Sequence, residues 1–255
     1  MITHDTIRSG KPRLSLIMPY YKNPTMLSMH YETWAGFPDE VKALFEVIIV
    51  DDGSPEEKAV DVPRPDGLPK LRIFEVEEDR LWYQHAARNI GAFEAVCRLL
   101  LLTDMDHMVT AQLILDAVDA PARSTRFFYV NRKEFDSDEW TLDDRGRRKS
   151  HPNTFVMLKK LYWAAGGYDE DYCGHYGTDG LFRHRLQERA RMELLPGDGY
   201  IRRLWRDLVP DASTRDVKRK EGRRPKFREE IAKWKKREGR PDVVTMTMPY
   251  HEAEL

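Results

Sequence analysis

Two runs of apolar residues near the N-terminus contain few polar side chains until each one ends in Pro, Asp or Gly. They cover residues 14–19 (LSLIMP) and 45–54 (FEVIIVDDGS). Continuous rather than alternating hydrophobicity is typical of strands that are covered on both faces of a parallel sheet. Residues 25–44 lie between the two runs and are numerous enough for a crossover helix, so the three segments predict a β-α-β unit.

The alternation of strands and helices continues through the first half of the chain. Further strands are predicted over residues 71–76 and 99–103, and helices over residues 84–97 and 111–118. The first of these helices has apolar side chains at helical spacing, namely Ala86, Ile90, Phe93 and Cys97. The first half is therefore expected to be a doubly wound α/β sheet with mostly parallel strands.

Beyond Pro121 the pattern becomes less regular. Strands are predicted over residues 127–132 and 153–158, and a helix over residues 178–191. The polar segment between the two strands, residues 134–149, is typical of a long surface loop. We expect an irregular second half that is rich in loops.

The composition is that of a soluble globular protein with a sizeable core. The chain has 255 residues, of which 41% are hydrophobic and 33% charged. It has no run of the roughly 18–20 apolar residues that a membrane span needs, and its N-terminus lacks the apolar segment of a secretory signal. Cys97 and Cys173 are too few for a disulfide framework. These features predict a cytoplasmic protein without integral membrane contact.

Charge is distributed unevenly along the chain. Residues 215–240 contain 13 Lys or Arg and 5 Asp or Glu, a net charge of +8, whereas the whole chain carries −1. Phe227, Ile231 and Trp234 have the spacing of one helix face, so a basic helix is expected here. Such a segment is a solvated surface, a binding site for a polyanion, or a contact with a membrane surface. The candidate polyanion-binding residues are Arg223, Arg224, Lys226, Lys233, Lys235 and Lys236.

Polar residues follow three of the predicted strands, at the edge where their carboxyl ends meet. They are Pro19 and Tyr20, Asp51 and Asp52, and Asp104 and Asp106. Each group alone is compatible with an ordinary turn, but ligands of parallel sheets bind at this edge. Carboxylates repel a diphosphate unless a divalent cation bridges them, and oxygen ligands favour Mg²⁺ or Mn²⁺ over zinc. The sequence contains neither GxxxxGK[ST] nor GxGxxG, the two common phosphate-binding motifs.

Five segments, in this order, resemble those of family 2-type glycosyltransferases with the GT-A fold. They are SLIMPYYKNP, VIIVDDGSPE, HAARNIGAFEA, LLTDMDHMV and AAGGYDEDYCGHYGTDGLFRHRL, within residues 14–186. The resemblance implies a GT-A domain over residues 1–210, with a donor half at 12–120 and an acceptor half at 121–210. Residues 211–255 would then form a basic C-terminal extension.

The resemblance also implies roles for residues at the sheet edge. Those that match segments holding the donor nucleotide are Pro19, Tyr20, Asp51, Asp52, Arg88 and Asn89. Asp104 and Asp106 match the D-x-D motif that holds the metal. We expect Asp106 to be the direct metal ligand, and Asp104 to face the ribose or sugar and to contact the ion only secondarily.

Asp179 begins the predicted helix in the sequence GTDG. An aspartate at such a position is a common N-cap. In the resembling family, the corresponding acid is the base that deprotonates the acceptor hydroxyl in an inverting transfer. That family often has Glu-Asp here, whereas this chain has Thr178 before Asp179, so Asp179 alone would serve. Asp169 and Asp171 are the alternatives.

The resembling family also often has a third metal ligand, frequently a later histidine, and the sequence leaves its identity open. His107 adjoins the D-x-D motif but would point away from it if the strand continued. The other candidates are His175, His184, His251 and Asp211.

These residues predict a metal-dependent transfer of sugar from a nucleotide-sugar, by analogy a UDP-sugar, to an acceptor hydroxyl. Some resembling enzymes of bacterial viruses glycosylate modified bases in DNA, and the basic segment makes hydroxymethylated DNA a candidate acceptor. A cell-surface or lipid-linked glycan is the alternative. A non-catalytic nucleotide-sugar or polyanion-binding protein would not need both Asp106 and Asp179. A nucleotidyltransferase would normally carry a Gly-rich basic loop after the first strand, and PYYKNP does not provide one.

Overall fold

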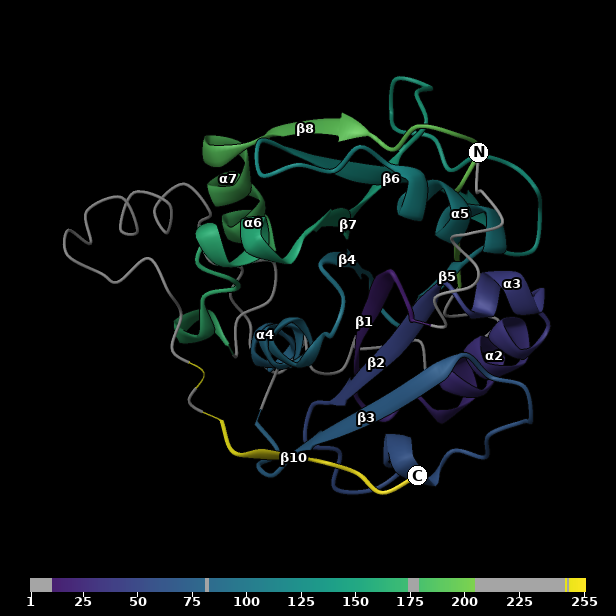
Figure 1. Cartoon of the computed structure of the whole chain (residues 1–255), viewed down its shortest axis with the longest axis vertical. Coiled ribbons are helices and arrows are strands. Elements are labelled where there is room, and N and C mark those ends of the chain that lie inside the picture. The colour runs from purple at the N-terminus through teal and green to yellow at the C-terminus, as the bar shows by residue number, and fades with distance from the viewer. Residues whose placement is uncertain (1–10, 81–82, 174–178, 205–245, 247) are drawn as a thin grey trace.

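In a computed structural model, helices cover both faces of one mixed sheet (Figure 1). The structure describes residues 11–80, 83–173, 179–204, 246 and 248–255. Within these residues the strand order is β10-β3-β2-β1-β4-β7-β6-β9-β5, with β8 paired to β6. No helix of the described part combines the length and the apolar character that crossing a membrane requires.

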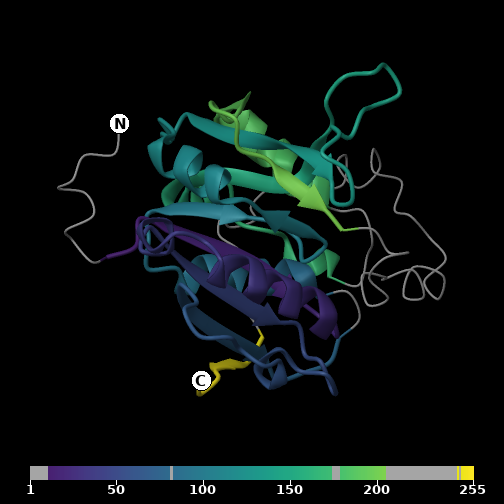
Figure 2. The ribbon, with the colours of Figure 1, turned by 90° about the vertical axis from the view of Figure 1, so that its right-hand side faces the viewer.

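Four neighbouring strands of the first half run parallel, as predicted. They are β1 (Leu14–Tyr20), β2 (Phe45–Asp51), β3 (Lys70–Val76) and β4 (Leu99–Leu102). Every residue of β1, β2 and β4 is buried, which explains their continuous hydrophobic pattern. Helices α2 (Pro24–Ala35) and α5 (Ala111–Asp119) pack on one face, and α4 (Gln84–Glu94) packs on the other (Figure 2). The predicted α/β architecture is confirmed.

The crossover between β1 and β2 is divided into two helices rather than one. Helix α2 ends at Gly36, and a single turn, α3 (Asp39–Lys42), begins after Pro38. Glycine is a poor helix former, and proline cannot continue a preceding helix because it lacks the backbone N–H group. The two residues therefore account for the break.

The second half is more regular than the sequence predicts. β7 (Ser150–Leu158) pairs antiparallel with β4, and β6 (Arg126–Glu134) pairs antiparallel with β7. Three short strands join β6 or one another: β5 (His107–Val109), β8 (Arg191–Leu194) and β9 (Ile201–Arg203). The remaining elements are α6 (Lys159–Ala164), α7 (Asp179–Arg189) and the 3-10 turns η1 (Ala59–Asp61) and η2 (Glu170–Tyr172). These three short strands carry too few apolar residues for a hydrophobic pattern to predict them.

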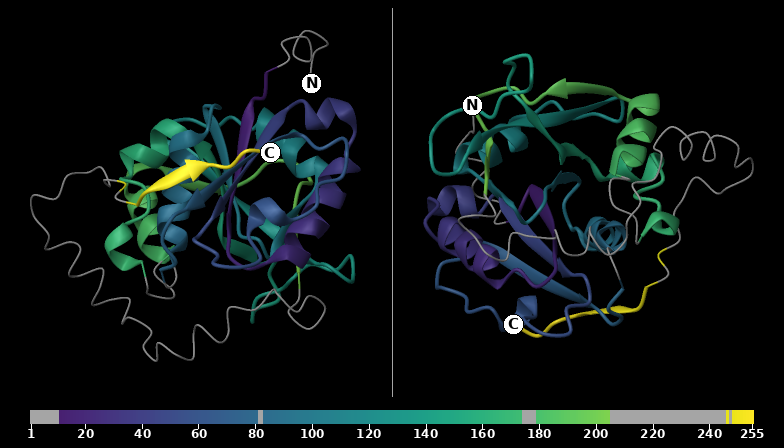
Figure 3. Two further views of the ribbon diagram at one scale, coloured as in Figure 1. Left: turned by 90° about the horizontal axis from the view of Figure 1, so that it is seen from below. Right: turned by 180° about the vertical axis from the view of Figure 1, so that it is seen from behind.

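The last described residues return to the sheet. β10 (Tyr250–Glu252) pairs antiparallel with β3 and lies at the margin of the molecule opposite β8 (Figure 3). The sequence does not predict this strand. The basic helix expected within residues 215–240 lies outside the described residues, and with it the candidate polyanion-binding residues Arg223, Arg224, Lys226, Lys233, Lys235 and Lys236.

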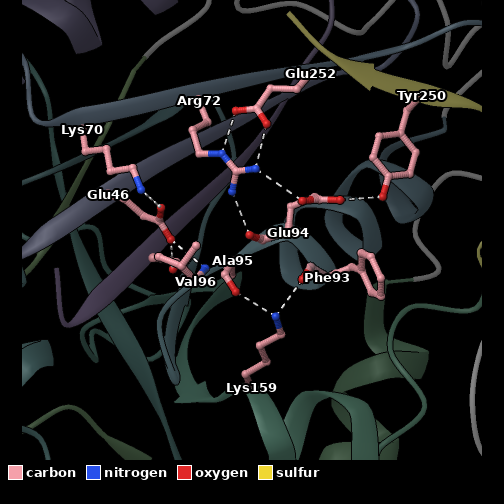
Figure 4. Close-up of polar contacts among 11 residues, drawn as sticks. Glu46, Lys70, Arg72, Phe93, Glu94, Ala95, Val96, Lys159, Tyr250 and Glu252 are labelled. Atoms are coloured by element: carbon pink, nitrogen blue, oxygen red, sulfur yellow. Dashed lines mark hydrogen bonds and ion pairs between the residues drawn. The ribbon is translucent and has the colours of Figure 1, made fainter. Parts of the chain in front are cut away.

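A polar network joins β10 to β3 and to the end of α4 (Figure 4). Arg72 donates to the Glu252 carboxylate at 2.7 and 2.8 Å and to the carbonyl oxygen of Glu94 at 2.9 Å. Tyr250 donates to the Glu94 carboxylate at 2.8 Å. Helix α4 ends at Glu94, three residues before its predicted end, and Phe93, one of the apolar residues at helical spacing, is 55% exposed.

Candidate functional site

The carboxyl ends of β1, β2 and β4 meet at one edge of the sheet, as predicted. Tyr20 at the end of β1 lies opposite Asp51 at the end of β2, and Asp104 follows β4 closely. Gly53 has a φ of 80°, and a Cβ at this position would lie 2.4 Å from the carbonyl oxygen of Glu78. Only glycine fits this turn, so the D-D-G-S sequence fixes the path of the chain after β2.

The two adjacent aspartates after β2 have different surroundings. Asp51 accepts hydrogen bonds from the backbone N–H groups of Ser54 and Ala59, at 2.9 and 2.8 Å. These bonds match the turn role that the sequence left open for it. The buried Oδ1 of Asp52 has no hydrogen-bond partner among the described residues. Burial, together with the charge of Asp51, raises the pKa of Asp52 well above its usual value. Asp52 is therefore the carboxyl group of the pair that can bind a ligand.

Pro19 and Tyr20 lie within β1 rather than after it, and both are buried. The Tyr20 hydroxyl donates to the carbonyl oxygen of Glu57, in the loop that follows β2. This contact shapes the loop beside Asp52. Tyr20 therefore supports this loop, and the expected contacts of Pro19 and Tyr20 with a donor nucleotide stay predictions.

Arg88 lies between the D-x-D sequence and Asp179. Its side chain is fully buried, Nη2 donates to Asp104 Oδ1, and Nη1 lies 3.7 Å from Asp179 Oδ1. Burial lowers the pKa of Arg88, but Asp104, Tyr168 and Asp179 together outweigh burial, and the net effect is a raised pKa. A Cβ at Gly91 would lie 2.4 Å from Ile17 Cγ2, so this glycine lets α4 pack directly on β1. The close packing brings Arg88 to the sheet edge.

The side chain of Asn89 is used within the protein. Its Nδ2 donates to Tyr168 O and to Glu170 Oε1, both at 2.8 Å. Its Oδ1 accepts from the Tyr162 hydroxyl at 2.6 Å and from the Tyr168 backbone N–H at 2.8 Å. Four bonds fill the capacity of an amide side chain. Asn89 thus anchors the G-G-Y-D turn to α4, and its expected contact with the donor stays a prediction.

Asp179 begins α7, as predicted, and its carboxylate faces α4. Its Oδ1 accepts a long hydrogen bond from Gln84 Nε2, at 3.4 Å. His85 Nε2 lies 3.7 Å from the same oxygen, as does Arg88 Nη1. Burial raises the pKa of Asp179, but the neighbouring side chains, His85 and Arg88 foremost, together outweigh burial and lower it to about 2. The carboxylate is therefore ionised at neutral pH.

The two aspartates of the D-x-D sequence have different partners. Asp104 accepts hydrogen bonds from Arg88 and, at 3.0 Å, from Asn153. Asp106 instead contacts His107, whose Nδ1 is 2.6 Å from Asp106 Oδ1. The Asp106 side chain is 36% exposed and that of Asp104 23%. Asp106 is thus the more accessible of the two to a cation.

Asp106, His107 and His151 form a group with the composition of a metal site. Each offers one ligand atom, and these atoms lie within 4.8 Å of one another. The two imidazole rings are stacked at 3.8 Å. Burial and the neighbouring His107 lower the pKa of His151 well below its usual value, so that this ring is neutral and has a lone pair to offer.

Two features of this group differ from the sequence-based expectation. His107 faces Asp106 rather than away from it, because the turn at Met105 separates β4 from β5. His151, on β7, was not among the candidates named from the sequence, because no local pattern marked it. One carboxylate and two imidazoles are a softer set than the oxygen ligands expected, and this set fits Mn²⁺ and no longer argues against zinc.

Two of the other candidates for the third ligand, His184 and His251, do not join this group within the part of the chain that the structure describes. His184 Nε2 lies 3.2 Å from Glu188, one turn further along α7. His251 lies on β10, at the opposite end of the strand order, 3.4 Å from Glu75. His175 and Asp211 lie outside the described residues.

His30 of α2 contacts Met105, the central residue of the D-x-D sequence. The ring is fully buried, and Nε2 lies 2.8 Å from the carbonyl oxygen of Met105. Burial lowers the pKa of His30 to about 4, so the ring is neutral at pH 7. Because a carbonyl oxygen only accepts, Nε2 carries the proton. The bond fixes the peptide between Asp104 and Asp106.

The sequence profile described as Glycosyl transferase family 2 matches residues 15–174. A search of curated proteins gave no match. Among solved structures, TarS of S. aureus has a TM-score of 0.59 and 18% identity, over 82% of this chain and 39% of that chain. A shorter TarS in complex with UDP-GlcNAc has a TM-score of 0.56 and 16% identity, over 82% of this chain and 65% of that chain. The same form in complex with UDP has a TM-score of 0.57 and 16% identity, over 76% of this chain and 60% of that chain.

The chain spans less than two thirds of the length of these TarS chains, and at such identities the likeness is one of fold. This fold is the GT-A type that the five sequence segments implied. The profile match covers more than half of the chain and contains strands β1 to β7, helix α4 and the D-x-D sequence. The chain therefore belongs to glycosyl transferase family 2.

Proposed function

We propose that this protein transfers a sugar from a nucleoside diphosphate sugar to an acceptor hydroxyl, with inversion at the anomeric carbon. The observation that carries the proposal is the position of Arg88, which contacts Asp104 of the D-x-D sequence and lies near Asp179. The guanidinium group of Arg88 thus lies between Asp104, expected beside the donor, and Asp179, expected to act as the base. This arrangement suits a site in which diphosphate and acceptor meet.

A uridine nucleotide is the donor best supported. The S. aureus TarS structures similar in fold include complexes with UDP and UDP-GlcNAc. In this chain, the buried Oδ1 of Asp52 has no partner among the described residues. A carboxyl group can bind the N–H and C=O edge of a pyrimidine, and a partner of this kind would satisfy the buried oxygen.

In the proposed reaction, Asp179 accepts the proton of the acceptor hydroxyl as that oxygen attacks the anomeric carbon and the bond to the diphosphate breaks. Its low pKa keeps the carboxylate ionised, so the proton moves late, when the forming C–O bond has made the hydroxyl acidic. A divalent cation, when bound, neutralises charge on the diphosphate. Asp106, His107 and His151 would hold it, and their two nitrogen ligands favour Mn²⁺ over Mg²⁺.

Replacing His30 with Met should weaken Mn²⁺ binding by about tenfold, because residues that orient metal ligands typically contribute this much. The variant keeps an apolar side chain of similar length but loses the hydrogen bond to Met105. His30→Gln, whose amide N–H can reach the same carbonyl oxygen, should retain most of the affinity. Electron paramagnetic resonance titration of Mn²⁺ measures both, with melting temperatures as the folding control. Equal affinities in wild type and both variants would contradict this role of His30.

Two acceptor classes are compatible with the sequence. The net charge of +8 in residues 215–240 favours hydroxymethylated DNA, and a cell-surface or lipid-linked glycan is the alternative. The test is a panel of nucleotide-sugars assayed for nucleotide release with Mn²⁺, with hydroxymethylated DNA, with an oligosaccharide and without acceptor. We expect release from a UDP-sugar, and DNA labelling that declines as salt rises. Labelling of the oligosaccharide alone would assign the glycan. Binding of UDP-sugars without turnover on either acceptor would favour a non-catalytic protein.

A further inference from the structure

Arg132, on β6, carries a buried positive charge near the D-x-D sequence. The residue is 8% exposed, and its Nη1 lies 3.5 Å from His107 Nε2. Its buried Nε has no hydrogen-bond partner in the part of the chain that the structure describes. Buried polar groups normally have a partner, because an unsatisfied buried charge is strongly destabilising. The surroundings of Arg132 are therefore incomplete without a hydrogen-bond acceptor.

A second arginine increases this positive charge. Arg203 of β9 lies opposite His107 of β5 and opposite Glu134 of β6 in the pairing of these strands. Burial, and then the charge of Arg203, lower the pKa of Arg132. The charge of Arg203 also acts on Asp106. The positive charges of Arg132 and Arg203 thus both act near Asp106. Two like charges at short distance destabilise the fold unless negative charge lies beside them.

The neighbouring carboxylates do not complete the surroundings of Arg132. Glu134 Oε1 accepts a hydrogen bond from Thr141 at 2.5 Å, and among the described residues no hydrogen bond joins Glu134 to Arg132. Asp106 is paired with His107, and in the proposed reaction it would hold the cation. The charges of Arg132 and Arg203 are offset by Asp106 and by Glu134, whose buried Oε2 also has no hydrogen-bond partner among the described residues. A bound cation would therefore give the region a net positive charge. A ligand with several negative oxygens fits this excess.

We propose that Arg132, together with Arg203, binds the diphosphate of the nucleotide-sugar. The assignment rests on the proposed function and deepens it by naming the cations that accompany the metal. A guanidinium group is planar and binds phosphate oxygens through two parallel N–H bonds. The diphosphate gains negative charge as its bond to the sugar breaks, and fixed cations stabilise that charge. Arg132 and Arg203 are thus contacts for the leaving group.

The test compares ligands that differ only in phosphate content. Calorimetry would measure the affinities of UDP, UMP and uridine, with Mn²⁺ and again with a chelator in its place. For Arg132→Gln we expect UDP affinity to fall by about 10- to 100-fold, as for the loss of a hydrogen bond to a charged group. Uridine affinity should not change. Arg132→Lys, which keeps the charge but not the paired geometry, should lie between.

Arg202→Gln is the matched control. Arg202 adjoins Arg203 in β9, and successive side chains of a strand point to opposite faces. It pairs with Asp138 at 3.0 Å, so its loss should leave UDP affinity unchanged. Should Arg132→Gln fail to fold, Arg203→Gln, at a less buried position, measures the same site.

The outcomes distinguish binding of the diphosphate by Arg132 from a structural role and from binding of the acceptor. A loss of UDP affinity that is absent for uridine and persists in chelator supports the assignment. Equal losses for UDP and uridine, or no loss, would overturn it and leave Arg132 with a structural role. If DNA binding falls while UDP binding does not, the phosphates bound belong to the acceptor and the assignment is overturned. Wild-type protein that binds no nucleotide would overturn the proposed function itself.

Discussion

Asp179→Asn is expected to reduce sugar transfer by about 10²- to 10⁴-fold, the contribution usual for a general base, while nucleotide-sugar binding stays within a few fold. Asparagine has nearly the same shape as aspartate and can still accept the hydrogen bond from Gln84, but it cannot take up a proton. Its lower charge also removes an ion pair with Arg88, which remains bound to Asp104. Single-turnover kinetics, together with calorimetry of UDP binding, separate the two effects.

Asp169→Asn is the control, because Asp169 was an alternative base in the same sequence segment. It is 6% exposed, and its carbonyl oxygen lies 3.3 Å from His85 Nδ1. We expect this variant to keep transfer within about tenfold of wild type, as for a change that moves a supporting residue. Full activity of Asp179→Asn, or a larger loss in Asp169→Asn, would contradict the assignment of the base.

The sequence predicts the parallel half well because its strands are buried on both faces. In β1, β2 and β4 every residue is buried, and only Ser15 and Glu46 interrupt the apolar pattern before the ends of the strands. The short strands β5, β8, β9 and β10 have no such pattern. Their stability comes from pairing with partners distant in the sequence, which no local pattern records. Phe93 is exposed although it shares helical spacing with Ala86 and Ile90, so spacing alone does not show which side chains of a helix are buried.

The sequence predicts that three of the candidate acids lie at one edge of the sheet. Asp104, Asp106 and Asp52 lie at the sheet edge because parallel strands place their carboxyl ends together. His151 could not be found in this way, since its approach to Asp106 depends on the pairing of β7 with β4. For Asn89, the sequence motif and the observed contacts differ. Its motif indicated a donor contact, but only tertiary structure shows that four internal hydrogen bonds use the amide.

Asp106→Ala should abolish measurable Mn²⁺ binding and lower kcat/KM by at least about 100-fold, because a bound cation contributes several kcal/mol to stabilisation of the developing charge. Among the candidate ligands, Asp106 is the only carboxylate, and neutral imidazoles alone bind divalent cations less well. His151→Ala should weaken Mn²⁺ binding less. His184→Ala is the control, since His184 pairs with Glu188 and is not a member of the group. Paramagnetic resonance measures the affinity, and nucleotide release the activity.

The Asp104→Asn variant tests which of the two aspartates, Asp104 or Asp106, binds the metal directly. Asp104 binds Arg88 and Asn153, so most of its hydrogen-bonding capacity is used within the protein. Its loss should disturb Arg88 and weaken the donor more than the metal. If Asp106→Ala retains Mn²⁺ binding and Asp104→Asn loses it, Asp104 is the direct metal ligand and Asp106 is not. Loss in neither variant would place the cation elsewhere, and the group of Asp106, His107 and His151 would then be a structural cluster. The difference in exposure, 36% for Asp106 against 23% for Asp104, favours Asp106 as the direct ligand.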